Sequence, residues 1–453
     1  VGFQKASNVL ELCNAKEYAT MMLEGNYDTY VSHFKKSIDN YGGSYADPDF
    51  HNWTYNTDND WYDLMLRTAL ITNHSVSIAG GSDKSTYSLG GSYLYQDGIM
   101  DVDNNYKRLN FRAAVDYNAT NWLKVGFNGV FSQSEQQVPN NAAWQKAFNC
   151  PPIVALYEKN NDKGFPDKYG SPDVLGYSSN FYNPIAFAQY FDSKNESYQA
   201  LTNFYAQVDF IPNKLNLRSN YSYSFLSTQG REFTPAYYVS SWLQSATTKL
   251  KKSEDKYYNR IWDNTLTYND QFGKHKVGAM VGMSMREEQW RNLNGSTSNV
   301  PDGEKEYWYI KNGNASGATV GDDGYCYRGL SYFTRLNYNY ADKYMLVFTM
   351  RADGSSKYQE KWGYFPSVGG AWVLSQENFL KNQKWLDMLK LRASWGKLGN
   401  DHIAASDGFN SVSSGNNFSG VFTNTTIPGY ENSNYFSWLK WEVVEEWNAG
   451  FNL

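Results

Sequence analysis

The sequence predicts an all-β protein, an antiparallel transmembrane β-barrel of about 14 strands in which short periplasmic turns alternate with long extracellular loops. Three observations lead to this prediction. Many segments alternate apolar and polar residues, the connections between these segments alternate in length, and 17% of the 453 residues are aromatic. Tyr and Trp rings favour places that are dry at one end and wet at the other, such as the edges of a membrane.

The strand pattern is clearest in residues 105–133. Alternate positions are apolar over 105–117 and again over 122–133, with turn residues at 118–121. Because successive side chains of a strand point to opposite faces, this is a hairpin with one apolar face and one face of Arg, Lys, Asp and Asn. The apolar positions are Leu109, Phe111, Ala113, Val115, Tyr117, Leu123, Val125, Phe127, Gly129 and Phe131. Alone, this hairpin favours a soluble sheet over a barrel wall in lipid.

Other segments complete the expected organisation. Further strands are expected at 1–6, 72–82, 86–96, 203–210, 215–225, 257–268, 275–288, 327–340, 344–351, 364–374, 389–398 and 443–453. A capping box from Asn14 to Glu17 predicts a helix through about Glu24, and 376–387 has helical character. Loops or irregular stretches are expected at 25–70, 134–196, 228–255, 292–325, 352–363 and 399–438.

The lengths of the connections favour the barrel. Short connections fall near residues 83, 119, 212, 272 and 342, at every second junction. An up-and-down barrel with short turns at one end predicts this alternation, whereas a soluble sandwich has no reason for it. A closed barrel leaves no strand edge in lipid, so a final strand that stops at Leu453 predicts a partial barrel whose remaining strands are missing.

Composition excludes several classes of protein. The mean hydropathy is −0.65, and no apolar run approaches the ~20 residues of a spanning helix. The net charge is −5 without a dense Lys/Arg block, which argues against nucleic acid as a partner. The three cysteines, Cys13, Cys150 and Cys326, lack metal-binding spacing.

Several runs resemble a known family. They are 73–82, 95–99, 182–185, 344–356, 362–372, 389–400 and 439–442. The most specific is the pairing of Arg-Ala-Asp-Gly-Ser-Ser, at 351–356, with Phe-Pro-Ser, at 365–367. In this order the runs resemble the SusC-like (SusC/RagA) TonB-dependent outer-membrane transporters of Bacteroidetes-type bacteria. Asp401 stands where that family more often has Gln.

The resemblance implies the following for the parent protein. It would be a multi-pass barrel in the outer membrane of a Gram-negative cell, with 22 strands around an N-terminal plug. It would import glycans or peptides with a SusD-like lipoprotein lid, drawing energy through TonB. Residues 1–453 would then be a partial barrel domain, without the plug, the TonB-binding segment and the final strands.

Catalytic and metal chemistry is not expected. The histidines His33, His51, His74, His275 and His402 are scattered, and none lies in a triad or metal motif. His74 and His275 fall in expected strands and are interpreted as wall residues. The acidic spots at 58–60, 101–103 and 322–323 are interpreted as solvated turns, because none has the full calcium-loop spacing. No cofactor is expected.

Aromatic side chains in the loops are the candidate ligand-binding residues. Sugar rings pack their apolar faces on Trp and Tyr, and these loop aromatics lie beside Asn, Asp and Ser. They are Trp144, Tyr157, Tyr169, Tyr177, Trp242, Trp308 and Tyr309. For any single one the alternative is loop packing or contact with a lid protein. The strand-end aromatics are interpreted as an interfacial girdle: Trp122, Tyr338, Tyr340, Tyr344 and Trp372.

The leading hypothesis is therefore part of a TonB-dependent nutrient importer, with binding energy in the extracellular loops and the lumen wall. Deleting the loop at 134–196 should then abolish substrate binding while the barrel still assembles. The alternatives are a secreted soluble glycan-binding β-protein and an outer-membrane enzyme, the latter needing a nucleophile–base pair. Apolar strand residues sealed inside a compact globule would refute the importer.

Overall fold

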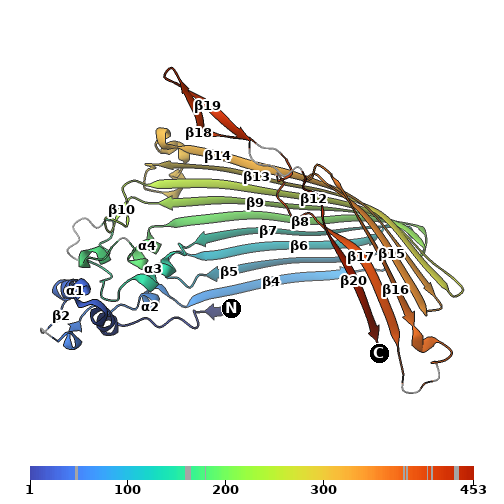
Figure 1. Ribbon diagram of the computed structural model, residues 1–453, viewed down its shortest axis with the longest axis horizontal. Coiled ribbons are helices and arrows are strands. Elements are labelled where there is room, and N and C mark those ends of the chain that lie inside the picture. Colours follow the sequence, from blue (N-terminus) through green and yellow to red (C-terminus); the bar gives the residue numbers. More distant parts are fainter. Residues whose placement is uncertain are drawn as a thin grey trace.

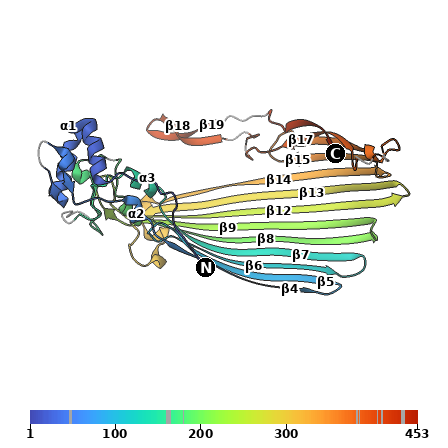
Figure 2. The same cartoon turned by 90° about the horizontal axis from the view of Figure 1, so that it is seen from below.

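A computed structural model describes residues 1–45, 49–158, 165–178, 180–380, 383, 386–405, 407–409, 412–432 and 438–453. Its main feature is a single 14-stranded sheet in which every neighbouring pair is antiparallel (Figure 1). The strands follow one another in chain order across the sheet, apart from three small two-stranded ribbons. The sheet is curled, so that β17 and β20 lie across from β4 (Figures 1 and 2). The expected fold class and strand number are confirmed.

The sheet contains β1 (Gly2–Gln4), β4 (Ala69–Gly81), β5 (Ser85–Asp97), β6 (Asn105–Asn118), β7 (Leu123–Val138), β8 (Asp192–Ile211), β9 (Leu215–Thr234), β12 (Lys249–Phe272), β13 (His275–Ser298), β14 (Thr319–Tyr340), β15 (Tyr344–Ser355), β16 (Trp362–Val373), β17 (Lys390–Asn400) and β20 (Glu442–Asn452). The ribbons are β2 (Gly43–Ser44) with β3 (Thr54–Tyr55), β10 (Tyr237–Tyr238) with β11 (Gln244–Ser245), and β18 (Val412–Phe422) with β19 (Thr425–Asn432).

Short turns lie at one end of the sheet, and the helices lie at the other (Figures 1 and 2). The turns join β4 to β5, β6 to β7, β8 to β9, β12 to β13 and β14 to β15, as the alternation of connections predicts. Asn213, Gly273, Ala341 and Asp342 adopt positive φ angles of 55–60° there. Such backbone reverses the chain within a few residues, and Gly and Asn adopt it most readily.

Several strands extend further toward the loop end than the sequence predicts. β9, β12, β13 and β14 enter the stretches 228–255 and 292–325, which were expected to be irregular. Similarly, β7 reaches Val138 and β8 begins at Asp192, so the connection is shorter than 134–196 and deleting that range would cut both strands. These extensions carry polar residues on both faces, which removes the alternation that marks a half-buried strand.

The helices also differ from the expectation. The capping box is present, with Asn14 Oδ1 accepting from Glu17 N at 2.9 Å, but α1 runs over Ala15–Tyr41 rather than to about Glu24. Asn26, beside Gly25, is non-helical and kinks α1, which explains why the sequence pattern predicted the end of the helix near Glu24. Other helices in expected loops are α2 (Trp61–Met65), α3 (Ala143–Asn149) and α4 (Pro184–Gln189). Short 3₁₀ turns occur at η1 (Phe50–Asn52), η2 (Pro172–Leu175), η3 (Lys305–Tyr307), η4 (Ile310–Asn312), η5 (Ala315–Gly317) and η6 (Leu374–Gln376).

The helix expected at 376–387 is not formed in its described part, where only Gln376, the last residue of η6, is helical. Residues 381–382 and 384–385 of that stretch lie outside the described residues. Within the described part of the chain, no helix is both long and apolar enough to cross a bilayer.

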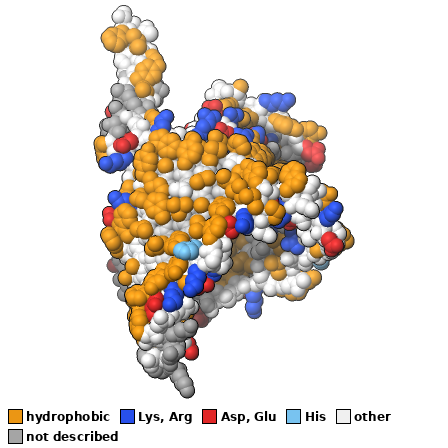
Figure 3. Space-filling view, turned by 90° about the vertical axis from the view of Figure 1, so that its right-hand side faces the viewer, with side chains coloured by type: hydrophobic (Ala, Val, Ile, Leu, Met, Phe, Trp, Pro, Cys, Tyr) orange, Lys and Arg blue, Asp and Glu red, His pale blue; other side chains and the backbone are white. Residues whose placement is uncertain are grey.

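One face of the sheet is apolar from β4 to β20. Cross-strand partners share a face, and one such row joins Ile78, Leu89 and Ala113, while another joins Leu266 and Val281. These side chains are not sealed in a core, since Val281 remains 52% exposed. Other exposed members are Val76, Phe111, Phe131, Phe204, Leu336, Leu346, Phe348 and Val368. Hydrophobic side chains gather in a broad patch with charged groups at its margins (Figure 3).

The largest buried core lies at the loop end instead. It packs α1 against α2 and the connection between β7 and β8. Trp61 is fully buried there, and its indole N–H donates to the Pro151 carbonyl at 3.1 Å. Other fully buried members are Leu23, Phe34, Met65, Met100, Ile153, Val154 and Leu175. Because this core lies at the loop end, the apolar face of the strands is left available to lipid.

Candidate functional site

The face of the sheet opposite the apolar one is polar, and it is the candidate site. Its residues alternate with the apolar set along each strand, and hydrogen bonds join them across strands. Tyr205 Oη donates to Asp116 Oδ1 at 2.5 Å, with the Arg218 guanidinium 3.8 Å from the Tyr205 ring. Gly126 leaves room for that ring, because a Cβ atom there would lie 2.1 Å from it. Further members are Asn110, Arg112, Asn128, Asn203, Ser222, Asp263, Ser284, Arg335 and Arg392.

A charged pocket of about 490 Å³ opens on the loop-end part of this polar face. It is lined by Arg286 and Glu288 of β13, Tyr327 of β14, Lys357, and 401–404. We call it the Tyr327 pocket. Since Arg286 and Glu288 are two residues apart on one strand, both point to the polar face, and they form an ion pair.

Tyr327 is the centre of this pocket. Its ring is buried, and its hydroxyl donates to Asp401 Oδ2 at 3.0 Å. Lys357 Nζ lies 4.9 Å from the ring centroid and donates to the Asp401 carbonyl at 3.0 Å. The Arg286 guanidinium also faces the ring, at 5.7 Å. These contacts hold both signs of charge around one aromatic ring, an arrangement that can take polar or zwitterionic ligands.

Sequence reasoning missed this pocket. Tyr327 and Arg286 are ordinary strand residues in the sequence, and Lys357 and Asp401 come from connections far away along the chain. The one available signal was charge at alternate positions of the strand, at Arg286 and Glu288. That signal places both side chains on the polar face, but it does not predict which connections pack against them.

The structure distributes the seven predicted aromatic residues over separate clusters. Tyr169, Tyr177 and Trp308 are buried, and Trp144 is half-buried against Tyr62. Burial raises the pKa of Tyr177, whose ring lies 4.4 Å from His33. The remaining three, Tyr157, Trp242 and Tyr309, are 50–58% exposed. The exposed three can touch a ligand as they stand, and a binding role for any of the seven remains a prediction.

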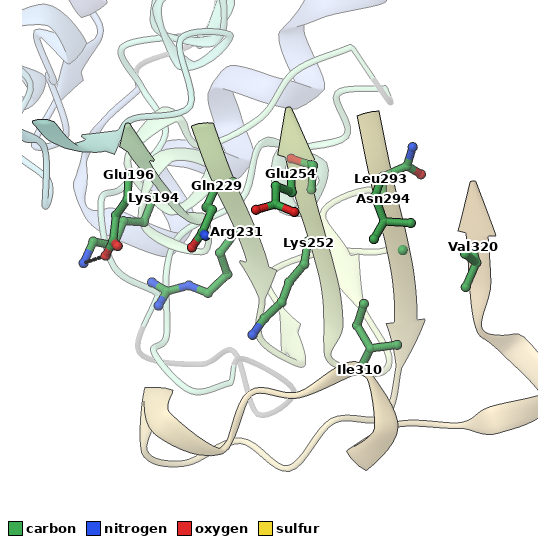
Figure 4. A pocket seen from close by; sticks show the side chains of 13 residues that line it. Lys194, Glu196, Gln229, Arg231, Lys252, Glu254, Leu293, Asn294, Ile310 and Val320 are labelled. Carbon is green, nitrogen blue, oxygen red and sulfur yellow. Dashed lines mark ion pairs between the residues drawn. The ribbon is translucent and has the colours of Figure 1, made fainter. Parts of the chain in front are cut away.

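Trp308 and Tyr309 lie on the other side of the wall from the Tyr327 pocket. Trp308 stacks on Phe233 at 3.6 Å, and Phe233 is in register with Leu250 on the side of the sheet that carries the apolar face. The connection between β13 and β14 therefore folds over the outside of the strand extensions. It covers a second cavity of about 430 Å³, in which Lys194, Arg231 and Lys252 project from β8, β9 and β12 (Figure 4).

The remaining sequence candidates have structural roles. His74 and His275 lie in β4 and β13, as expected of wall residues. Asp58 accepts from the backbone N–H of Ala15, and Asp60 caps α2, so both stabilise helix starts. Within the described ranges, no three His, Cys, Asp or Glu side chains are placed to share a metal ion. Cys13, Cys150 and Cys326 are unpaired thiols.

The aromatic residues predicted to form a girdle lie at the short-turn end. Tyr344 lies between Tyr340 and Trp372, with ring centroids 6.3 and 6.2 Å away. Tyr344 Oη and Trp372 Nε1 both donate to Glu377, at 2.8 and 3.2 Å. Each ring thus has an exposed apolar body and a polar tip held toward the turn, which suits a membrane interface.

Comparison with known proteins favours the barrel wall over the soluble sheet as the interpretation of this fold. No family model matches the chain. It is 29% identical over 405 residues to TonB-dependent receptor P3 of Formosa agariphila, covering 87% of this chain and 39% of the relative. It is also 29% identical over 428 residues to TonB-dependent receptor SusC of Bacteroides thetaiotaomicron, covering 87% and 40%. The chain is thus similar in sequence to TonB-dependent receptors, SusC among them.

A solved structure shares the fold of this chain. The RagAB peptide transporter superposes with a TM-score of 0.74 at 20% identity, covering 95% of this chain and 47% of that one. The sheet accordingly has the fold of a β-barrel wall, as predicted. The chain spans about 40% of the length of the curated relatives it matches.

Proposed function

We propose that the whole protein carrying this chain is an active importer of the outer membrane. In this proposal the polar face lines an aqueous path and the apolar face contacts lipid. A SusD-like lipoprotein covers the extracellular end, and TonB supplies energy from the inner membrane. The observation that carries the proposal is the sheet with two unlike faces, whose apolar residues stay exposed across the strands from β4 to β20. The relatives are receptors by name, so we propose transport and no catalytic step.

We further propose that the chain is part of a larger barrel domain, of 22 strands by its family resemblance. Among the described residues, β1 and β20 are the outer strands of the sheet and do not pair with each other. Hydrogen-bonding groups left open at such edges are costly in lipid. Further strands would satisfy them, and a plug inside a closed wall would gate the path.

For the substrate we propose a glycan or a peptide that contacts the Tyr327 pocket and the exposed loop aromatics. The pocket offers Arg286, Glu288, Lys357 and Asp401 as partners for hydroxyl, amide, amino or carboxylate groups. Tyr157 and Trp242 offer exposed rings at the loop end. The buried Tyr169, Tyr177 and Trp308 and the half-buried Trp144 would support these loops, whereas Tyr309, on the other side of the wall, would not share a substrate with the Tyr327 pocket.

Binding to the intact importer tests this placement. The probes are a tryptic digest of casein and a mixture of neutral oligosaccharides, each measured with wild type and with a variant carrying Arg286→Ala and Lys357→Ala. Losing two charge-assisted hydrogen bonds should weaken the preferred probe by about tenfold or more. Lys252→Ala, on the other side of the wall, is the matched control and should change little. Equal binding by wild type and the double variant would remove the pocket from the substrate path.

Membrane placement is tested separately by extraction. The importer should stay in the outer-membrane fraction after washing with carbonate and should need detergent for release. Release without detergent would favour a secreted glycan-binding protein instead.

A further inference from the structure

A row of three charged residues borders the apolar band of the sheet on its loop side. Arg260 of β12 is in register with Glu287 of β13, which is in register with Arg328 of β14. Glu287 forms ion pairs with both arginines. Its Oε2 atom lies 2.8 Å from Arg328 Nε, and its Oε1 atom contacts Arg260 Nη1. One carboxylate thus faces two guanidinium groups, and the row keeps a net positive charge. We call it the Arg-Glu-Arg row.

The row lies where the apolar band ends toward the loops. The neighbouring row on the same face, one step closer to the short turns, joins Trp262, Met285 and Leu330. Beyond it toward the turns come Leu266, Val281 and Leu336, which are exposed and apolar. In a barrel wall this border between apolar and charged residues marks the depth at which acyl chains give way to lipid headgroups.

A hollow of about 720 Å³ adjoins the Arg-Glu-Arg row. Its apolar part is formed by Tyr221, Trp262, Met285, Leu330 and Trp362, and its charged part by Arg260, Arg286, Glu287, Arg328 and Lys361, which carry a net positive charge. Gly354 lies between Leu330 and Trp362 in register, and a Cβ atom there would come within 3.3 Å of the Trp362 ring. The glycine therefore keeps the hollow open between two apolar side chains.

We propose that this hollow binds a phosphorylated glycolipid of the outer leaflet. Its phosphate would contact Arg260 and Arg328, and one acyl chain would lie along Trp262, Leu330 and Trp362. Arginine suits this role because its planar guanidinium can donate two hydrogen bonds to one phosphate. Arg328 is available for it, since its side chain is 72% exposed even while it contacts Glu287. Free phosphate would gain nothing from the apolar half of the hollow. The proposal concerns the lipid side of the wall and holds whatever substrate is imported.

The test compares lipid retention by the intact protein. Wild type, an Arg260→Ala/Arg328→Ala variant and an Arg112→Ala/Arg218→Ala control are purified from outer membranes in mild detergent. Bound phosphorylated glycolipid is then measured by mass spectrometry. Each cation near a membrane surface contributes appreciably to anionic lipid binding, so the first variant should retain about tenfold less. The control removes the same charge from the polar face and should match wild type. Equal retention by all three proteins would overturn the proposal.

Added probes separate the lipid from other sources of phosphate. Bisphosphorylated lipid A should rebind to delipidated wild type more tightly than its dephosphorylated form, and inorganic phosphate should not compete at millimolar concentration. Competition by inorganic phosphate would identify a simple anion site and refute the lipid. The Arg260→Lys/Arg328→Lys variant preserves charge and the ion pairs, so it should assemble and keep part of the lipid. Lys361→Glu leaves the Arg-Glu-Arg row untouched and should lower retention; unchanged retention in Lys361→Glu would also count against the hollow.

Discussion

A charge placed on the apolar face should destabilise the barrel far more than the same charge on the polar face. Val281 lies near the middle of the apolar band on β13, with Leu266 and Thr334 as its cross-strand partners. In lipid, Val281→Arg should cost about 2–4 kcal/mol of folding free energy, the range for an arginine near the bilayer midplane. This corresponds to at least about a 30-fold change in the folding equilibrium constant. If the face were in water, a site 52% exposed should tolerate arginine within about 0.5 kcal/mol.

The matched control lies three residues further along the same strand. Ser284 points to the polar face, in register with Asp263, which would accept an arginine as a partner. Ser284→Arg should therefore fold nearly as well as wild type. The assay is urea-dependent folding of the whole protein into lipid vesicles, followed by the shift in gel mobility that an intact barrel shows without heating. Equal folding free energies for the two variants would refute the assignment of the faces.

The loop-end core supports further predictions. Trp61→Ala should cost about 3–5 kcal/mol locally, because it empties a fully buried site beside Pro151; hydrogen exchange should quicken in α1 and α3 while β12 and β13 stay protected. Asn14→Ala removes the cap of α1 and should cost about 1 kcal/mol, read from faster exchange in its first turn, with Ser7→Ala as the control. Burial, and then the nearby Lys36 charge, lower the pKa of His33 below its ordinary 6.5. As the pH falls, His33 therefore takes up its proton more readily in the unfolded state than in the folded state. Hydrogen-exchange protection of α1 should be constant above about pH 6.5 and fall as the pH drops below it, and His33→Gln should remove that dependence.

The sequence predicted the membrane-facing part of the wall well, because lipid on one side and water on the other impose strict alternation. Residues 105–133 show this directly, and their hairpin was predicted to within a few residues at each end. Outside the bilayer, both faces of a strand contact water. The alternation then disappears, and the ends of β9, β12 and β13 could not be recognised.

The candidate site could not be predicted for a different reason. Tyr327 of β14 contacts Asp401 because the fold brings a distant connection to the strand, and no local sequence pattern predicts that contact. The loop aromatics were identified as a class, yet their surroundings divide them. Tyr177 became part of a core around α1, whereas Trp242 remained exposed, because the packing partners of each come from far along the chain.

The long strands imply a tall vestibule. β12 and β13 each contain 24 residues. At about 3.3 Å per residue and a tilt of roughly 40°, they would rise about 60 Å, whereas the apolar band of such walls is about 25 Å tall. More than half of the wall would then stand above the bilayer. In the proposed importer, a captured substrate would pass between these tall strands well before reaching membrane depth, and whatever closes the opening would lie at a distance from the lipid surface.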